Sequence, residues 1–504
     1  MSIVIFSYKM STNTILLKKF NYLKDLAFIN GKWTLGINKA TFPVLSPTTR
    51  QVVANVPDLS EVDIKASISC ANDAFHSWQH TSCRYKSDIL KKLSSQMLKN
   101  EDELATIVTL ESGKPFHEAK VEVKFAASFL EWFSEEAKRI NGEVLPNIEP
   151  HLRRFVLKQP VGVCGMITPW NFPLAMIARK VAPALAAGCT TVIKPSEETP
   201  LSALAFAQLV DEVQVPQGVV NVITCSRNNT ELAGLLLCTS PLVRNISFTG
   251  STKVGKWLLE KSASTVKKVS LELGGNAPFI VFDSADIKLA ADKAVKSRFR
   301  NAGQTCICAE RILVQENVYE SFIDEFKKIT MALRVRDPMS SECDMSSLIN
   351  EQALAKVEDH VNDALLNGGK IVCGGKKLSS NGSLFYEPTI IRDCTTNMKC
   401  IAEETFGPVA PVIKFKTEEE ALLLANSRNS GLAGYIFTNN TSQSWRVAER
   451  LEVGMVSVNE SAFSNEMIPF GGIKESGLGR EGSSHGVEEY IELKLVCMGA
   501  LENK

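Results

Sequence analysis

The sequence predicts an α/β fold made of two doubly wound domains, each built on a largely parallel sheet. From about residue 160, apolar runs rich in β-branched residues alternate with segments of helical periodicity, which is typical of strands joined by crossover helices. A second alternating series begins near residue 276. A chain of 504 residues also exceeds the size that a single core supports.

The residues ahead of this alternation are expected to form packing elements. Residues 28–33 predict a short strand with an Asn-Gly turn, and residues 40–56 predict a small hairpin. Apolar residues then recur at helical spacing over residues 60–139. We interpret these helices as packing elements, without a part in the chemistry.

The first alternating series places polar residues where strands end. Ligands of doubly wound sheets bind at the carboxyl ends of the strands. Trp170, Lys194, Glu197 and Gly250 each follow a predicted strand. The predicted strands are 160–168, 190–193, 219–223 and 245–248, and the helices are 174–187, 202–212 and 232–237.

The second series predicts another α/β domain over about residues 276–480. No low-complexity linker separates it from the first series. Its predicted strands are 278–282, 311–314, 412–415 and 433–437, and its helices are 318–333 and 357–367.

Composition argues against several classes of function. The chain has 56 basic and 56 acidic residues, so no charge surplus favours nucleic acid or an anionic membrane. No apolar run is long enough to predict a transmembrane helix. The 13 cysteines lack the spacing of a zinc site or of a disulfide framework, which predicts no metal and a reducing compartment.

The first 24 residues bear on the compartment. They contain lysines but no acid and no arginine, a partial match to a mitochondrial presequence. A tail ahead of the first strand is the simpler interpretation. We therefore expect a cytoplasmic protein, with the mitochondrion as the alternative.

Residues 299–308 present a candidate nucleophile, Cys306, among small residues, an arginine and backbone amides. A thiol acts as a nucleophile when neighbouring groups lower its pKa or accept its proton. The alternative is an ordinary core cysteine, because cysteine is among the most buried residue types.

Two further motifs are compatible with a dinucleotide. Gly250 and Gly255 frame a turn that enters a helix, where amides and the helix dipole favour phosphate, although such turns are common. Glu197, near Lys194, can accept hydrogen bonds from ribose hydroxyls and would repel a 2′-phosphate, which favours NAD over NADP. The alternative for this pair is two solvated charges in a loop.

Two glutamates complete the set of candidates. Glu272 lies in an apolar run, where a raised pKa suits a general base; an ion-paired or capping glutamate is the alternative. Glu404 precedes Phe406 by two residues, so both side chains can face one ribose and ring, whereas a simple turn is the alternative.

Together these residues suit the oxidation of an aldehyde. Cys306 would add to the carbonyl to give a thiohemiacetal, and Asn171 with the Cys306 backbone amide would stabilise the oxyanion. Loss of hydride to NAD would leave a thioester. Glu272 would activate the water that hydrolyses this thioester.

The chain resembles the aldehyde dehydrogenase superfamily from about residue 26 to residue 500. The matching blocks are 168–173, 248–252, 271–278, 303–308, 403–409 and 469–472. Within the superfamily it is most similar to the succinate-semialdehyde dehydrogenase subfamily. That similarity rests on residues 303–308, Arg179, Arg300 and the segment Ser464-Asn465-Glu466.

The resemblance implies NAD-dependent oxidation of succinate semialdehyde to succinate, in 4-aminobutyrate degradation. Arg179, Arg300 and Ser464 would clamp the distal carboxylate of the substrate, since a guanidinium pairs well with a carboxylate. Residues 459–463 depart from the family pattern and leave the chain-length preference open. The alternatives are a glutarate-semialdehyde or broader semialdehyde dehydrogenase and, outside enzymes, an inactive binding relative.

The resemblance also implies roles in proton transfer and cofactor binding. Lys180 and Glu481 would relay protons from the general base. NAD is expected, with NADP less favoured. The residues implied to hold the cofactor are Thr168, Trp170, Lys194, Ser196, Glu197, Gly250, Ser251, Gly255, Leu273, Glu404 and Phe406.

The spacing of two thiols suggests regulation as well. Cys308 is a candidate redox switch that would form a reversible disulfide with Cys306, although so short a loop strains disulfide geometry. The alternative is that Cys308 is simply packed.

The family fold implies how the chain is divided and assembled. A β arm bridges subunits in this family, so we expect a homotetramer or homodimer, with a small semialdehyde as substrate and no nucleic acid or membrane partner. The implied segments are a tail (1–25), an NAD-binding domain (26–138 and 161–275), a catalytic domain (276–485) and the oligomerisation arm (139–160 and 486–504).

Overall fold

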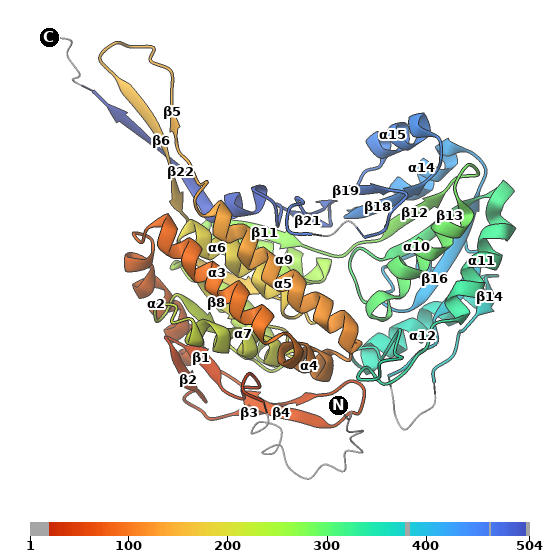
Figure 1. Cartoon of the computed structure of the whole chain (residues 1–504), viewed down its shortest axis with the longest axis horizontal. Helices are drawn as coiled ribbons and strands as arrows, with labels where there is room; N and C mark the ends of the chain where they lie inside the picture. Colours follow the sequence, from red (N-terminus) through yellow and green to blue (C-terminus); the bar gives the residue numbers. More distant parts are fainter. Residues whose placement is uncertain (1–19, 379–383, 463–464, 500–504) are drawn as a thin grey trace.

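The structure is a computed structural model that describes residues 20–378, 384–462 and 465–499. Two large sheets, one in each lobe of the molecule, carry most of the strands (Figure 1). Both are doubly wound α/β sheets, as the alternation of strands and helices predicts. Within the described ranges, no helix combines the length and the apolar character needed to cross a bilayer.

The first sheet has the strand order β2-β1-β9-β8-β7-β10-β11-β21. Its central strands, from β9 to β11, run parallel, and antiparallel strands close both edges. The strands are β1 (Ala27–Ile29), β2 (Lys32–Thr34), β7 (Val163–Ile167), β8 (Thr190–Lys194), β9 (Val220–Val222), β10 (Val243–Thr249), β11 (Lys268–Glu272) and β21 (Gly477–Leu478).

Helices cover this first sheet, and the most buried of them is α6. Every residue of α6 is buried, and the helix ends at Gly188, whose φ of 98° suits glycine. The helices of this lobe are α2 (Glu61–Trp78), α3 (Cys83–Lys99), α4 (Glu101–Ser112), α5 (Phe116–Glu136), α6 (Ala175–Ala187), α7 (Pro200–Glu212), α8 (Thr230–Thr239) and α9 (Thr252–Ser262).

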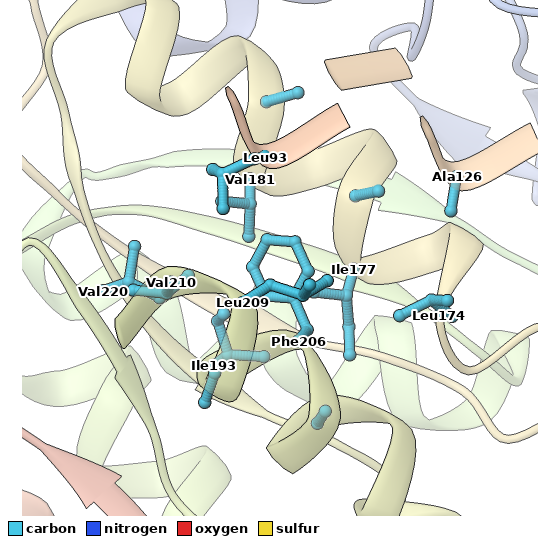
Figure 2. Close-up of a cluster of buried hydrophobic side chains, with 14 of the residues drawn as sticks. Leu93, Ala126, Leu174, Ile177, Val181, Ile193, Phe206, Leu209, Val210 and Val220 are labelled. Carbon is cyan, nitrogen blue, oxygen red and sulfur yellow. The ribbon is translucent and has the colours of Figure 1, made fainter. Parts of the chain in front are cut away.

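The core of the first lobe lies between these helices and the sheet. Figure 2 shows Phe206 of α7 among Ile177 and Val181 of α6 and Ile193 of β8, all fully or almost fully buried. Burying side chains of this size stabilises the fold by about 1.5–3 kcal/mol each. This packing fixes α6 against the sheet whose strand ends carry the candidate site.

The second sheet has the order β14-β15-β16-β13-β12-β18-β19, parallel except at β14. Its strands are β12 (Ala277–Val281), β13 (Ala309–Gln315), β14 (Lys370–Cys373), β15 (Thr389–Arg392), β16 (Val409–Phe415), β18 (Ala433–Phe437) and β19 (Met455–Val458). The helices of this lobe are α10 (Ile287–Phe299), α11 (Tyr319–Met331), α12 (Glu351–Leu366), α13 (Lys399–Ala402), α14 (Glu418–Asn426) and α15 (Thr441–Arg450).

A three-stranded antiparallel arm extends from the first lobe (Figure 1). It consists of β5 (Glu143–Val144), β6 (Arg153–Pro160) and β22 (Ile491–Met498), and the last two pair along their full lengths. Two smaller strand pairs are β3 (Thr41–Leu45) with β4 (Val52–Pro57) and β17 (Ser430–Gly431) with β20 (Ile473–Lys474).

The structure differs from the expected element pattern in two places that matter for the site. The helix α10, directly before the candidate nucleophile, was not among the predicted elements, because alanines form much of its buried face and give a weak apolar stripe. The strand β21 lies within the predicted catalytic segment yet pairs with β11 of the first sheet. This return brings residues near 480 beside the end of β11.

Candidate active site

A cavity of about 290 Å³ lies where the strand ends of the first sheet meet the loops of the second lobe. Segments far apart in the sequence contribute to it, including the residues after β7, β10 and β11 and the loop before β13. The predicted site residues that line it are Trp170, Asn171, Arg179, Gly250, Ser251, Glu272, Leu273, Arg300, Cys306, Glu404 and Phe406.

A left-handed turn presents Cys306 to this cavity. Asn301, Ala302 and Gly303 follow α10 with φ values of 49°, 53° and 75°. Each residue other than glycine costs about 1–2 kcal/mol in this region, so the surroundings must hold the turn. The backbone N–H of Asn301 donates to Glu118 Oε2 over 3.0 Å, which anchors the turn to α5.

The Cys306 thiol has a pKa raised to about 12, and burial is the main cause. Among the cations, Arg179 has the largest opposing effect on this pKa. The neighbouring charges therefore do not produce a thiolate at neutral pH in the free protein. A proton acceptor must take the thiol proton when the nucleophile attacks.

Glu272 is placed to be that acceptor. It ends β11 and lines the same cavity as Cys306. Burial, followed by the negative charge of Glu481, raises its pKa well above the usual value. Its Oε2 atom has no hydrogen-bond partner among the described residues. A buried carboxyl group with a free oxygen and a raised pKa suits a general base.

Glu481 links two cations behind Glu272. Its carboxylate oxygens lie 2.5 Å from Arg179 Nε and 2.5 Å from Lys180 Nζ. Lys180 Nζ also donates to Ser247 Oγ over 3.0 Å, and its pKa is lowered by burial. Lys180 and Glu481 thus form a buried pair whose charges both act on Glu272.

The side-chain amide of Asn171 has a fixed orientation. Its Nδ2 donates to the Gln304 carbonyl over 3.1 Å, and its Oδ1 accepts from Phe172 N over 3.1 Å. Gln304 is itself held by the N–H of Ile349, 2.9 Å from its Oε1. One N–H bond of the Asn171 amide remains for an oxyanion on a substrate bound to Cys306.

The residues predicted to hold the cofactor begin at the N-terminus of α9. Ser251 caps this helix, and its Oγ accepts from Val254 N over 3.4 Å. The helix N-terminus offers free amides to a phosphate. Buried Thr168 Oγ1 and Thr249 Oγ1 have no partner among the described residues, so this edge has hydrogen-bonding capacity left for a dinucleotide.

Glu404 and Phe406 close the opposite wall. Glu404 Oε1 accepts from Gly275 N over 3.0 Å, and burial raises its pKa to about 8. Phe406 has a φ of 55°, and its ring meets that of Trp170 edge-on with 5.5 Å between centroids. The wall therefore combines a carboxyl group with two aromatic rings, which suits a ribose and a nicotinamide ring.

The residues predicted to hold adenosine lie beyond the cavity, at the end of β8. Lys194 Nζ is 3.7 Å from Glu197 Oε2, and Glu197 Oε1 is 3.9 Å from Arg227 Nη1. Ser196 is buried beside them, and its Oγ accepts from the N–H of Glu198 over 3.3 Å. The Thr168 N–H donates to the Lys194 carbonyl, which joins this group to the end of β7.

Gly255 lies on α9 against Leu273. A Cβ at position 255 would collide with the Leu273 side chain, so the absence of a side chain lets the helix approach β11 closely. This contact places the α9 N-terminus beside Glu272 at the sheet edge.

Two arginines line the substrate side of the cavity. The Arg179 guanidinium carbon is 4.3 Å from the centroid of the Phe470 ring, and that of Arg300 is 5.0 Å from the centroid of Phe172. Arg179 is buried and paired with Glu481, whereas Arg300 is exposed. The third predicted clamp residue, Ser464, lies outside the described residues.

The second thiol of the nucleophile loop points elsewhere. Cys308 is buried, and its Sγ lies 3.9 Å from the Arg298 carbonyl oxygen. Burial raises its pKa to about 11. It does not line the cavity.

Several cavity residues were not predicted as site residues: Phe125, Phe172, Met176, Thr305, Lys356 and Phe470. Lys356 Nζ donates to the Glu404 carbonyl over 2.5 Å and so supports the cofactor wall. Phe172 and Phe470 belong to the motif blocks that predict the family, and this membership could have marked them as site residues. Phe125 and Lys356 lie on helices and carry no such signal.

Comparison with known proteins agrees with this geometry. Residues 33–496 match the model of the aldehyde dehydrogenase family. The mitochondrial succinate-semialdehyde dehydrogenase of Rattus norvegicus is 52% identical over 95% of this chain and 91% of its own length.

Solved structures agree as well. Succinate-semialdehyde dehydrogenase from Burkholderia pseudomallei has a TM-score of 0.93 and 46% identity, covering 95% of this chain and 98% of that one. An NADP dependent enzyme of E. coli has a TM-score of 0.93 and 47% identity, covering 95% and 99%. These similarities confirm the predicted fold class, and the chain belongs to the aldehyde dehydrogenase family.

Proposed function

We propose that this enzyme oxidises succinate semialdehyde to succinate with NAD, using Cys306 as the nucleophile. The observation that carries the proposal is the pair of guanidinium groups, Arg179 and Arg300, in the same cavity as Cys306 and Glu272. A substrate with an aldehyde at one end and a carboxylate at the other matches both halves of this cavity.

The first chemical step forms a bond between Cys306 Sγ and the aldehyde carbon. Glu272 takes the thiol proton, and the carbonyl oxygen becomes an oxyanion that accepts from Asn171 Nδ2 and the Cys306 N–H. The wall formed by Glu404 and Phe406 would hold NAD, which would supply the hydride acceptor for this carbon, and the carbonyl would re-form as a thioester on Cys306.

The second step releases the acid. Glu272 passes its proton towards Lys180 and Glu481 and, as a carboxylate, takes a proton from water. The water oxygen attacks the thioester carbon, and the C–S bond breaks. Succinate leaves, and Cys306 regains its proton.

The donor set at the cofactor edge favours NAD. Glu197 supplies a carboxylate where the adenosine ribose would lie, and a 2′-phosphate there would be repelled. NADP remains the alternative, since members of the family use either dinucleotide and the similar E. coli enzyme is NADP dependent. The names of the relatives from rat and Burkholderia support the proposed substrate.

A substrate panel with both cofactors tests the proposal. We expect kcat/KM for succinate semialdehyde to exceed that for glutarate semialdehyde, and that for butanal by a wider margin, each measured with NAD and NADP. Equal activity on the neutral aldehyde would contradict the substrate assignment. A preference for the five-carbon semialdehyde would favour the alternative, a glutarate-semialdehyde dehydrogenase.

One variant tests the alternative that this chain is an inactive binding relative of the family. Cys306→Ala should abolish turnover while NAD still binds, as followed by quenching of protein fluorescence. Wild-type protein without turnover on any aldehyde of the panel would favour the inactive relative. Full turnover by the variant would refute the nucleophile assignment.

Assembly and pathway belong to the same proposal. The arm exposes apolar side chains, among them Val144 (75%), Leu493 (68%) and Leu495 (61%), which supports its use as a subunit contact. We propose a homotetramer or homodimer, to be measured by light scattering, and a place in 4-aminobutyrate degradation.

For the compartment, the sequence favours the cytoplasm. The name of the rat relative, which includes "mitochondrial", supports the alternative. Fractionation of cells that express the full chain separates the two.

A further inference from the structure

A buried ion pair lies directly behind the oxyanion donor. Lys114, which precedes α5, and Glu122 on α5 form an ion pair whose side chains are both 0% exposed. Neither residue lines the cavity. We propose that Lys114 and Glu122 are positioning residues that hold Asn171 and the start of α6 in the geometry that the reaction needs.

Lys114 acts on the backbone of Asn171. Its ammonium group donates to the Asn171 carbonyl oxygen over 2.8 Å, and Nζ lies 3.7 Å from the centroid of the Phe172 ring. Asn301 Nδ2 donates to the same carbonyl over 3.2 Å. The peptide that carries the oxyanion donor is therefore tied both to α5 and to the turn before Cys306.

Glu122 acts on the helix that follows. Its Oε1 accepts from Leu174 N over 2.9 Å and from Ala175 N over 3.3 Å, at the N-terminus of α6. The same helix carries Arg179, which is proposed to bind the substrate carboxylate, and Lys180, which pairs with Glu481 behind Glu272. One ion pair thus holds the short segment from Asn171 to Ala175, which leads into the helix that carries these two side chains.

Another buried carboxyl group in the same lobe, Glu111, caps a helix without a cation, and burial raises its pKa to about 8. Glu111 accepts from Leu201 N over 2.7 Å and Ser202 N over 2.8 Å at the start of α7, and no ion pair to it occurs among the described residues. No predicted site residue lies on α7. A buried cap can thus form without a cation, as a group with a raised pKa. Beside Glu122, the Lys114 ammonium group also donates to the Asn171 carbonyl, a contact that Glu111 has no counterpart for among the described residues.

Stability also gives little reason for the pair. The desolvation of two buried charges offsets most of their attraction, and apolar side chains of similar size are often as stabilising. What an apolar pair cannot supply is a hydrogen bond that fixes the peptide of Asn171. A displacement of about 1 Å at such a group can cost about a hundredfold in rate.

The test removes the charges together so that neither is left buried alone. In Lys114→Met/Glu122→Gln, the glutamine retains an oxygen for the α6 amides, while the hydrogen bond to Asn171 is lost. We expect kcat/KM for succinate semialdehyde to fall about 10- to 100-fold, mainly in kcat. In Glu122→Gln alone, kcat/KM should fall less than in the pair variant, because the hydrogen bond from Lys114 to Asn171 remains. Glu111→Gln is the matched control and should keep the wild-type kcat/KM.

Two readouts separate positioning from a general structural defect. Alkylation of Cys306 by iodoacetamide forms no oxyanion, so its rate should stay within about twofold of wild type. In a double-mutant cycle, the pair variant should add little to the loss caused by Asn171→Ala, because both remove the same interaction. A fall in alkylation parallel to kcat, full additivity, or an equal loss in Glu111→Gln would overturn the proposal.

The inference rests on the proposed function, and the cycle distinguishes the two. If Asn171→Ala keeps wild-type activity, the proposed oxyanion role fails; if it loses activity while the pair variant does not, only the positioning role fails. Should the pair variant not fold, as judged by thermal melting, the same cycle is run with Lys114→Met, which removes the hydrogen bond to the Asn171 carbonyl and lets Glu122 take up a proton. Its full additivity with Asn171→Ala would overturn the proposal.

Discussion

Replacing Arg300 by glutamine should separate the recognition of the substrate carboxylate from the chemistry. Arg300 lines the cavity and is exposed, and no ion pair to it occurs within the described ranges. Its cation is therefore available to a carboxylate that enters from solvent. Glutamine keeps a polar side chain of moderate length but has no charge.

The size of the effect follows from the kind of interaction that is lost. A hydrogen bond to a charged group contributes about 1.5–3 kcal/mol. Water competes at an exposed side chain, so we take the lower half of that range. With a tenfold change for each 1.36 kcal/mol, kcat/KM for succinate semialdehyde should fall about 10- to 40-fold.

The assay compares two aldehydes of equal length on the same variant. Butanal lacks the carboxylate, so its kcat/KM should change less than about threefold in Arg300→Gln. Arg179→Gln should lower both values, because Arg179 also pairs with Glu481 and opposes the raised pKa of the Cys306 thiol. An equal fall in kcat/KM for both aldehydes in Arg300→Gln would refute the specificity assignment. Arg300 would then support the turn that presents Cys306.

Three further predictions concern pH, cofactor choice and oxidation. Activity should rise with pH, because burial raises the pKa of Glu272 and its protonated form cannot accept a proton; a kcat/KM profile with its midpoint near 4.5 would contradict this. Glu197→Ser should raise the ratio of NADP to NAD activity by at least about tenfold, and an unchanged ratio would exclude Glu197 as the determinant. Peroxide should oxidise Cys306 to a sulfenic acid, and Cys308, once its thiol turns from the Arg298 carbonyl, should displace water from it to form a disulfide that dithiothreitol reduces. In Cys308→Ala, further peroxide should oxidise the sulfenic acid to a sulfinic acid, so dithiothreitol should restore activity in wild type but not in this variant. Equal loss in both, without recovery in either, would leave Cys308 as a packed thiol.

Much of the fold and of the cavity lining could be predicted because the relevant signals are local. The strand before Trp170 and Asn171 is a continuous apolar run, and the residues that follow it reach the cavity because strand ends of a parallel sheet share one edge. Neighbours within a few positions make Cys306 a candidate nucleophile, and the structure places it in the cavity lining. Its pKa could not be predicted, because burial depends on contacts from the whole chain and here outweighs the nearby cations.

The groups that could not be predicted are those defined by distant contacts. Lys114 and Glu122 lie within residues 60–139, which the periodicity predicts to be packing helices without a part in the chemistry. The packing of α5 against α6 buries them and brings Lys114 to the Asn171 carbonyl and Glu122 to the start of α6.

The pairing of Lys180 with Glu481 has the same origin, although the resemblance to the family supplied the residues. They are far apart in the sequence and meet because β21 returns to the edge of the first sheet. Sequence periodicity reports which face of an element is apolar, but a buried charge contradicts that periodicity. Buried charges are stable only when paired or hydrogen-bonded, so a pair that touches an active-site peptide deserves a functional test before a structural explanation is accepted.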